Sequence, residues 1–363
     1  MKFERLFANK IFEKFQNRFL IWRKILEKEK FYQILQRVPK AELHIHIEAV
    51  ITMSSIRALW KKRFGTEMTL DEQNALFTYD DLNGFIQAFL KVQDLFIEVS
   101  DFDYVFDDFA RYLKGNGIVY CEAFFAPSAF IKKGFDYGAM VENFSRNIKK
   151  IHDECGITIK LMMDVSRTFG LENAMANYEM MKKFPAECIF GIGLGGAEQK
   201  GPCKDFGPVF EKAHAEGFHA VAHAGEDVGP ESIWDAINIL HSERIGHGIT
   251  AIQDEKLLSL LVEKQIPLEV CPTSNTFTKK IVSKMEEHPI RAFFDRGLLV
   301  TVGTDDPVFF KTTLLDEFWA LHTKLNFTLD EIKVLIENSF KASFLSASEK
   351  DEWLSKVRAA FEN

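Results

Sequence analysis

This chain of 363 residues lacks the features that mark several common protein classes. Its five cysteines are scattered and form no Cys-x-x-Cys pair, which favours free thiols in a reducing compartment over a disulfide framework. No apolar run approaches the roughly 20 residues needed to cross a bilayer. No signal peptide with a small-residue cleavage site is visible. We therefore expect a cytoplasmic protein.

Negative charge exceeds positive charge after the first forty residues. Residues 1–40 hold eleven Lys/Arg and four Glu, a balance of +7, so the remainder carries −15 and the whole chain −8. No basic stripe is left there to neutralise phosphates, which argues against a nucleic-acid partner.

Within the basic segment, apolar residues recur at roughly helical spacing. They are Phe3, Leu6, Phe7, Ile11, Phe15, Phe19, Trp22, Ile25 and Leu26. One interpretation is a helix that binds a membrane surface or a partner. The favoured interpretation is an added helix packed on the main domain. We predict an amphipathic helical extension over residues 1–37, without membrane association, and one domain over 38–363.

The fold class follows from alternating strand and helix patterns after residue 40. Eight apolar runs have strand character: 42–47, 118–125, 158–165, 188–194, 219–224, 244–247, 267–271 and 298–303. Most are separated by helical patterns, and that alternation implies parallel strands. Eight such units predict a closed (β/α)8 barrel, with extra helices from residues 59–95 over one end. The rival fold, an open doubly wound sheet, lacks its expected Gly-x-Gly-x-x-Gly turn.

Four strand-like runs end in metal-ligand or acid-base residues. In the most informative one, an apolar β-branched run over 299–303 leads into the adjacent carboxylates Asp305 and Asp306. The other three lie at 42–46, 221–226 and 244–248. Active sites of such barrels lie at the C-terminal ends of the strands, so we expect these residues to form one site.

The predicted metal ligands are three imidazoles and a carboxylate. His44 and His46 are two residues apart on a strand, so their side chains point the same way. His223 ends the fifth run, and Asp305 follows the eighth. This ligand set suits zinc, with iron or cobalt as other options.

Glu226 and His247 are the predicted acid-base pair for a metal-activated water. The alternative for Glu226 is a helix N-terminal acid that is stabilised by the helix dipole. Asp306 is expected to point away from the metal and bind substrate. The fourth run ends in glycines over 191–196 rather than in a metal-bridging lysine. That favours a single metal and offers bare backbone N–H groups to a flat ligand.

Six stretches resemble the adenosine deaminase family of the amidohydrolase superfamily. They are Glu-Leu-His-Ile-His (42–46), Gly-Leu-Gly-Gly-Ala-Glu (193–198), His-Ala-Gly-Glu (223–226), Glu-Arg-Ile-Gly-His-Gly (243–248), Cys-Pro-Thr-Ser-Asn (271–275) and Thr-Asp-Asp-Pro (304–307). Their order and spacing fit from about residue 38 to Lys350, and residues 1–37 lie outside the resemblance.

The resemblance implies one zinc, held by the four ligands above, and hydrolytic deamination of a 6-aminopurine. Water activated by the zinc would attack C6. Glu226 would protonate N1, while His247 orients or deprotonates the water. Asp306 and the Gly196 backbone would contact other ring nitrogens.

The chain departs from the family at the first motif. Adenosine deaminases usually continue it as Asp-Gly-Ala, whose Asp contacts the ribose, whereas this chain has Glu48-Ala49-Val50. We expect Glu48 to lie above the metal and bind a sugar, and we expect adenosine as substrate. The alternatives are aminodeoxyfutalosine, adenine, a hydrolase acting on another C–N bond and a non-catalytic binding protein.

Overall fold

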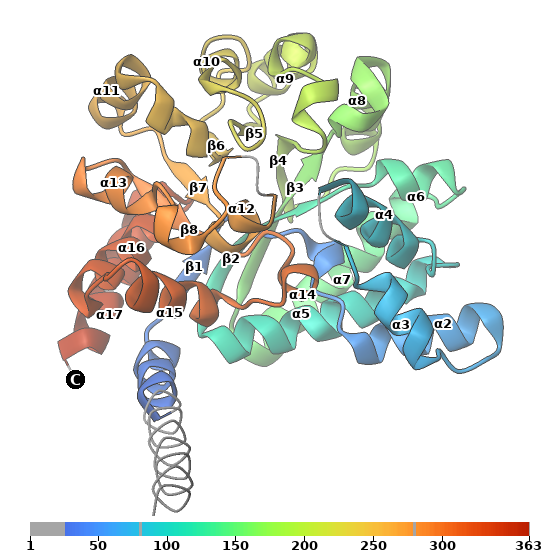
Figure 1. Ribbon diagram of the computed structural model, residues 1–363. Helices are drawn as coiled ribbons and strands as arrows, with labels where there is room; N and C mark the ends of the chain where they lie inside the picture. The colour runs from blue at the N-terminus through green and yellow to red at the C-terminus, as the bar shows by residue number, and fades with distance from the viewer. Residues whose placement is uncertain (1–25, 80–81, 279–280, 363) are drawn as a thin grey trace, which may run out of the picture.

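Eight parallel strands form the centre of the molecule. The computed structural model describes residues 26–79, 82–278 and 281–362. The strands follow one another around the sheet in the order β1 to β8. A parallel bridge between Ile45 and Asp305 joins the segments that follow β1 and β8, so the sheet closes. Figure 1 shows the strands in the middle with the helices outside them. The predicted (β/α)8 barrel is confirmed.

The strands are β1 (Lys40–Glu42), β2 (Ile118–Phe125), β3 (Thr158–Asp164), β4 (Ile189–Leu194), β5 (His219–Ala224), β6 (Arg244–His247), β7 (Leu268–Val270) and β8 (Val300–Val302). The longer helices are α2 (Met53–Phe64), α4 (Leu82–Gln93), α5 (Phe102–Asn116), α7 (Tyr137–Cys155), α8 (Gly170–Lys183), α9 (Gly207–Ala215), α10 (Pro230–Asn238), α11 (Glu255–Lys264), α15 (Leu314–Lys324), α16 (Leu329–Ala342) and α17 (Ala347–Glu362). The shorter ones are α3 (Leu70–Leu76), α6 (Ser128–Lys132), α12 (Pro272–Thr278), α13 (Ile290–Asp295) and α14 (Pro307–Phe310).

The first strand differs from the predicted run at 42–47. After β1, the chain makes single bridges to two different neighbours instead of a ladder with one. Ile45 bridges to Asp305, and His46 bridges to Phe124. The backbone N–H of His46 donates to the carbonyl of Asp305 at 2.9 Å, while the Ile45 carbonyl accepts from Phe124 N at 2.8 Å. This segment therefore ties β8 to β2 at the barrel rim.

An apolar plug fills the barrel beneath that rim. Phe124, Met162 and Val221, from β2, β3 and β5, form a buried cluster separate from the main core. The Phe124 ring lies 5.1 Å from the His44 ring and 5.2 Å from the His46 ring, between centroids. His44 and His46 therefore pack on an apolar surface, where charges are poorly screened.

Residues 26–37 form a helix on the outside of the barrel, below α15 in Figure 1. The ring of Phe31 is buried 5.2 Å from that of Trp319 and 5.1 Å from that of His322. Lys28 pairs with Asp316 at 2.8 Å. This described part of the extension packs on the domain. The amphipathic pattern over residues 1–25 lies outside the described residues. Within the described ranges, no helix has both the length and the apolar character needed to span a bilayer.

Candidate active site

A cavity of about 250 Å³ opens at the C-terminal ends of the strands. Its polar floor contains His46, His223, Glu226, His247 and Asp305. An aromatic wall of Phe85 and Phe89 from α4, with Phe310 from α14, lines its outer part. Ring centroids of Phe85 and Phe310 lie 4.9 Å apart. The helices predicted over residues 59–95 thus supply the apolar side of this cavity.

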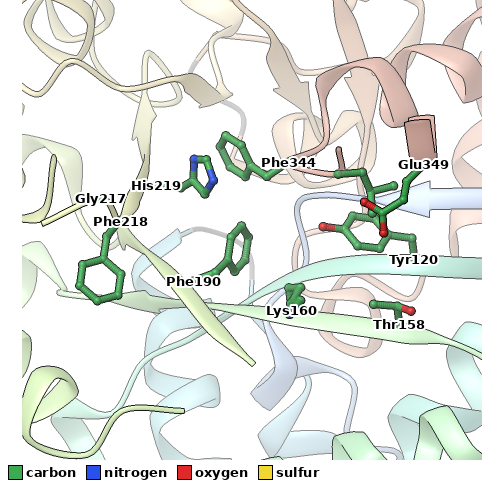
Figure 2. Close-up of a pocket in the computed structure, with 10 residues that line it drawn as sticks. Tyr120, Thr158, Lys160, Phe190, Gly217, Phe218, His219, Phe344 and Glu349 are labelled. Atoms are coloured by element: carbon green, nitrogen blue, oxygen red, sulfur yellow. The ribbon is translucent and has the colours of Figure 1, made fainter. Parts of the chain in front are cut away.

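A larger hollow of about 510 Å³ lies at the opposite end of the barrel (Figure 2). It is lined by Thr158 and His219, the first residues of β3 and β5, and by Phe190 and Phe344. The His219 and Phe344 rings stack with centroids 3.8 Å apart. None of the residues predicted to carry chemistry lines it. Size alone is therefore a poor guide here, because the smaller cavity has the reactive groups.

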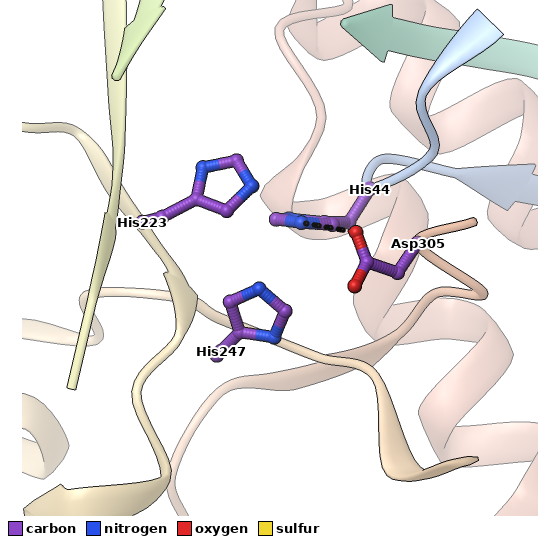
Figure 3. A group of neighbouring side chains, drawn as sticks. All are labelled: His44, His223, His247 and Asp305. Atoms are coloured by element: carbon purple, nitrogen blue, oxygen red, sulfur yellow. Dashed lines mark ion pairs between the residues drawn. The ribbon is translucent and has the colours of Figure 1, made fainter. Parts of the chain in front are cut away.

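Four predicted site residues converge at the cavity floor. The ligand atoms of His44, His223, His247 and Asp305 all lie within 4.8 Å of one another (Figure 3). His46 joins the same cluster: its Nε2 lies 3.2 Å from His223 Nε2 and 3.3 Å from Asp305 Oδ1. Ligands of a tetrahedral zinc, at ~2.0–2.1 Å from the metal, lie roughly 3.3 Å apart. The observed spacing fits a bound divalent metal.

The orientation of His44 also fits a metal. Its Nδ1 lies 2.8 Å from the carboxylate of Glu269, a contact in which the imidazole donates. Its Nε2 is buried without a hydrogen-bond partner, 3.7 Å from Asp305 Oδ1. A carboxylate behind a histidine is the usual support of a metal ligand, since it keeps a proton on Nδ1 and orients Nε2 toward the metal. Gly246 gives the ring room, because a Cβ there would lie 2.8 Å from His44 Cε1.

Glu226 is positioned by a buried carboxylate. The side chain of Glu198 accepts the backbone N–H groups of residues 225–228 at 2.6–3.3 Å, and it also accepts the hydroxyl of Ser232. Those contacts fix the loop that follows β5. Glu226 then lies with Oε2 3.6 Å from His247 Nε2, and both residues line the cavity.

The electrostatics of the floor separate the carboxyl groups. Burial, reinforced by the charges of Asp305 and Glu198, raises the pKa of Glu226 well above its usual range. Burial alone would raise the pKa of Asp305 too, but the neighbouring imidazoles of His44, His46 and His247 hold it well below its usual range. These opposite shifts favour the proton on Glu226 and the carboxylate form at Asp305.

The pKa values of the imidazoles also shift in opposite directions. Burial and the nearby His44, His247 and His46 lower the pKa of His223 well below its usual range. For His44, burial is outweighed by Asp305 and Glu269, which raise its pKa to about 9. A metal arriving at this cluster must displace the His44 proton, so binding should weaken as the pH falls.

The three predicted substrate-binding residues occupy different places. Gly196 and Asp306 line the cavity. Gly196 has a φ of +99°, and a Cβ would meet Thr168 Oγ1 at 2.9 Å. Glu48 is 3% exposed and is not among the residues that line the cavity. Its Oε1 accepts the backbone N–H of Ala126 at 2.7 Å, and its Oε2 is buried without a partner.

Several functional neighbours were missed from sequence. Glu269, Asn275, His288 and Gln93 all contact or line the site. For Glu269 a signal existed, since it interrupts the apolar run Leu268-Glu269-Val270 of β7. The glycine argument for a single metal is consistent with the structure: Lys200 is exposed and does not line the cavity.

Comparisons with known proteins agree with this geometry. A family profile described as adenosine deaminase matches residues 39–360. The adenine deaminase of Crocosphaera subtropica is 35% identical over 321 residues, 88% of this chain and 98% of the relative. The aminodeoxyfutalosine deaminase of Streptomyces avermitilis is 35% identical over 325 residues, 88% of this chain and 90% of the relative.

Among solved structures, the adenine deaminase of Arthrobacter aurescens superimposes with a TM-score of 0.85 and 29% identity, covering 90% of this chain and 100% of that chain. The match spans the whole barrel and includes every strand end that carries a site residue. The chain therefore belongs to the adenosine deaminase family, and it is an aminohydrolase that deaminates an aminopurine.

Proposed function

We propose that the protein hydrolyses adenine to hypoxanthine and ammonia. The observation that carries this proposal is the small cavity, whose floor holds acid and metal-ligand groups and whose outer wall is aromatic. A flat, apolar base fits between such surfaces. The names of the relatives from Crocosphaera and Arthrobacter support adenine over the adenosine that we expected from sequence.

The aromatic side of the cavity favours a base over a sugar. Phe85, Phe89 and Phe310 have no group that could pair with ribose hydroxyls, and burying a hydroxyl without a partner is unfavourable. Gln93 offers something that adenine can use. It lines the cavity, and its Oε1 is buried without a hydrogen-bond partner. Adenine has a ring N–H on its imidazole side, whereas a nucleoside has a glycosidic bond at N9. We propose that Gln93 accepts this N–H.

We further propose that His44, His46, His223 and Asp305 hold one divalent metal, with zinc as the expected ion. Their spacing and the bare Nε2 of His44 support this set. His247 is assigned to the substrate side, because its Nε2 faces Glu226. When bound, such a metal supplies Lewis-acid activation of the attacking water.

The residues of the chain then divide the proton transfers. The neutral carboxyl of Glu226 gives its proton to N1, which makes C6 electrophilic. Water oxygen forms the new bond at C6, and one water proton restores Glu226. The other leaves with the amino group as the C6–N bond breaks, so ammonia and a 6-oxopurine result. Asp306 and the Gly196 backbone hold the ring against the floor.

A second candidate substrate is aminodeoxyfutalosine, favoured by the 35% identity to the Streptomyces enzyme. The stretches 229–234 and 267–275 resemble that group as well. In this case, the aromatic wall would cover the bulky group on the sugar. The predicted contact between Glu48 and ribose belongs to this alternative and to adenosine.

One ammonia-release screen discriminates these substrates. Adenine, adenosine, deoxyadenosine, AMP and aminodeoxyfutalosine are assayed with the zinc-loaded protein. We expect the highest kcat/KM for adenine. A tenfold preference for a nucleoside would overturn the adenine proposal and favour the corresponding alternative. The His46→Ala variant should be inactive on all five, and His214→Ala, altered on α9 away from the cavity, should match the native protein.

A further inference from the structure

A chain of hydrogen bonds runs behind the cavity floor and begins at a backbone N–H of α13. The Ile290 N–H donates to Nδ1 of His288 at 3.1 Å. A backbone amide can only donate, so Nδ1 of His288 must be the unprotonated nitrogen. His288 is 3% exposed, and burial lowers its pKa to about 3. The ring is therefore neutral and carries its single proton on Nε2.

The second link is Asn275 of α12, which is fully buried. Its Oδ1 lies 3.3 Å from His288 Nε2 and accepts that proton. The hydrogen-bond network therefore distinguishes the amide oxygen of Asn275 from its amide nitrogen, which have nearly the same shape. The opposite end, Nδ2, lies 3.1 Å from Nδ1 of His247. Since an amide nitrogen can only donate, Nδ1 of His247 accepts.

The last link faces the reaction. His247 is 1% exposed. With Nδ1 accepting, the ring cannot be an imidazolium; it is neutral, and its single proton lies on Nε2, the nitrogen 3.6 Å from Glu226 Oε2 at the cavity floor. A protonated Nε2 has no lone pair with which to bind a metal or remove a proton from water.

We propose that Asn275 and His288 are positioning residues that hold His247 as a neutral N–H donor aimed into the cavity. The catalytic consequence rests on the proposed deamination: His247 orients the attacking water by donating to its oxygen, and it does not act as a base. From the sequence, His247 could either orient the attacking water or deprotonate it. The direction of the hydrogen bonds from Ile290 through His288 and Asn275 to His247, which we call the relay, favours orientation.

The relay makes a prediction that does not depend on activity. In zinc-loaded protein labelled with ¹⁵N-histidine, the His247 ring should show a protonated Nε2 and an unprotonated Nδ1, with its signals assigned by loss in His247→Gln. The nearly isosteric Asn275→Asp reverses the polarity, because a carboxylate must accept from both rings. We expect the His247 proton to move to Nδ1, and kcat to fall by roughly 10²–10³-fold with little change in KM, as for loss of one preorganised donor.

A pair of variants at His288 provides a second test. His288→Gln keeps an N–H for Asn275 and should stay within several-fold of native kcat. His288→Phe removes it, frees the amide to turn and should lower kcat at least tenfold more. His214→Phe is the matched control, since its Nε2 bonds the carbonyl of Leu240 away from the cavity. It should leave the His247 signals and kcat unchanged.

The outcomes separate the two proposals. A native His247 spectrum with the proton on Nδ1 overturns the relay, whatever the substrate. An Asn275→Asp variant that shows the moved proton but keeps kcat within threefold overturns the donor role. If no aminopurine is turned over, the proposed function fails, yet the native spectrum still tests the relay by itself. If Asn275→Asp does not fold, the native spectrum and the His288 pair decide.

Discussion

Replacing Glu269 by Gln should weaken metal binding from outside the ligand set. Glu269 is fully buried; one of its oxygens accepts from His44 Nδ1 at 2.8 Å, and the other accepts from Arg244 Nε. A glutamine can satisfy only one of these donors. If its oxygen stays on Arg244, its NH₂ faces His44 and drives the imidazole proton to Nε2, the nitrogen needed by the metal. If the amide turns, its NH₂ faces Nε–H of Arg244, and neither of these two donors has an acceptor.

The magnitude follows from those two contacts. Loss of a carboxylate behind a metal-bound histidine typically weakens metal binding by about 10–100-fold, or about 1.4–2.8 kcal/mol. Loss of one charge-assisted hydrogen bond to Arg244 should lower the free energy of unfolding by about 1.5–3 kcal/mol. Arg244 keeps its second carboxylate, Glu122 at 2.7 Å, so its charge is not left alone.

Glu122→Gln is the matched control for this experiment. Glu122 is equally buried and pairs with Arg244, but its other contacts are the hydroxyl of Tyr120 and the backbone N–H of Phe344. Both variants should lose similar stability in urea unfolding. Only Glu269→Gln should show a higher zinc Kd in competition with a chelator. Equal zinc affinities for the two variants would refute the role of Glu269 in holding His44.

Other predictions test the ligands, the acid and the substrate contacts. His46→Ala should lose both bound metal and activity, measured by metal analysis and ammonia release; two tightly bound metals in the native protein would contradict the single site. Glu226→Gln should keep its zinc but lower kcat by about two to four orders of magnitude. Native kcat should fall as the pH rises through the raised pKa of Glu226, because the proton donor is lost. Zinc loss in Glu226→Gln would make it a ligand instead. Gln93→Met should raise KM for adenine by about threefold to tenfold, as for one hydrogen bond, and an unchanged KM would exclude the contact. Glu48→Ala should leave adenine turnover nearly unchanged; a KM rise of about tenfold or more for a nucleoside would support the ribose contact.

Strand polarity made the site predictable from sequence. In a parallel barrel, all C-terminal strand ends meet at one rim, so residues far apart in the chain could be grouped without knowing any distance. His44, His223 and Asp305 come together as expected. The periodic apolar pattern likewise predicted seven strands near their observed bounds. The prediction was wrong for the first strand, which ends at Glu42. The residues after it make single bridges to two different neighbours, and the apolar pattern cannot distinguish such bridges from a regular strand.

The supporting residues had no comparable signal. His288 lies in a polar stretch before α13, and nothing in its neighbourhood indicates that it reaches His247 through Asn275. Helical spacing placed helices within 59–95 but could not orient α4, so the aromatic wall and Gln93 emerged only from the folded chain. The proposed preference for adenine depends on that wall, which sequence reasoning could not see when it favoured adenosine.

Two of the site residues, His247 and Asp305, share a strained backbone conformation. His247 and Asp305 have φ values of +60° and +63°, a left-handed conformation that costs non-glycine residues roughly 1–2 kcal/mol. Glycine would remove that cost, and it occurs at Gly225 and Gly248, with φ of +69° and +67°, where a Cβ would also lie within 2.5 Å of Thr250 Oγ1 and 2.7 Å of Leu268 Cδ2, respectively. At the ends of β6 and β8, the bend and a side chain are required at the same residue, because the turn itself aims the imidazole and the carboxylate into the cavity. Substituting glycine at either position should therefore relax the backbone while removing the group for which the strain is retained.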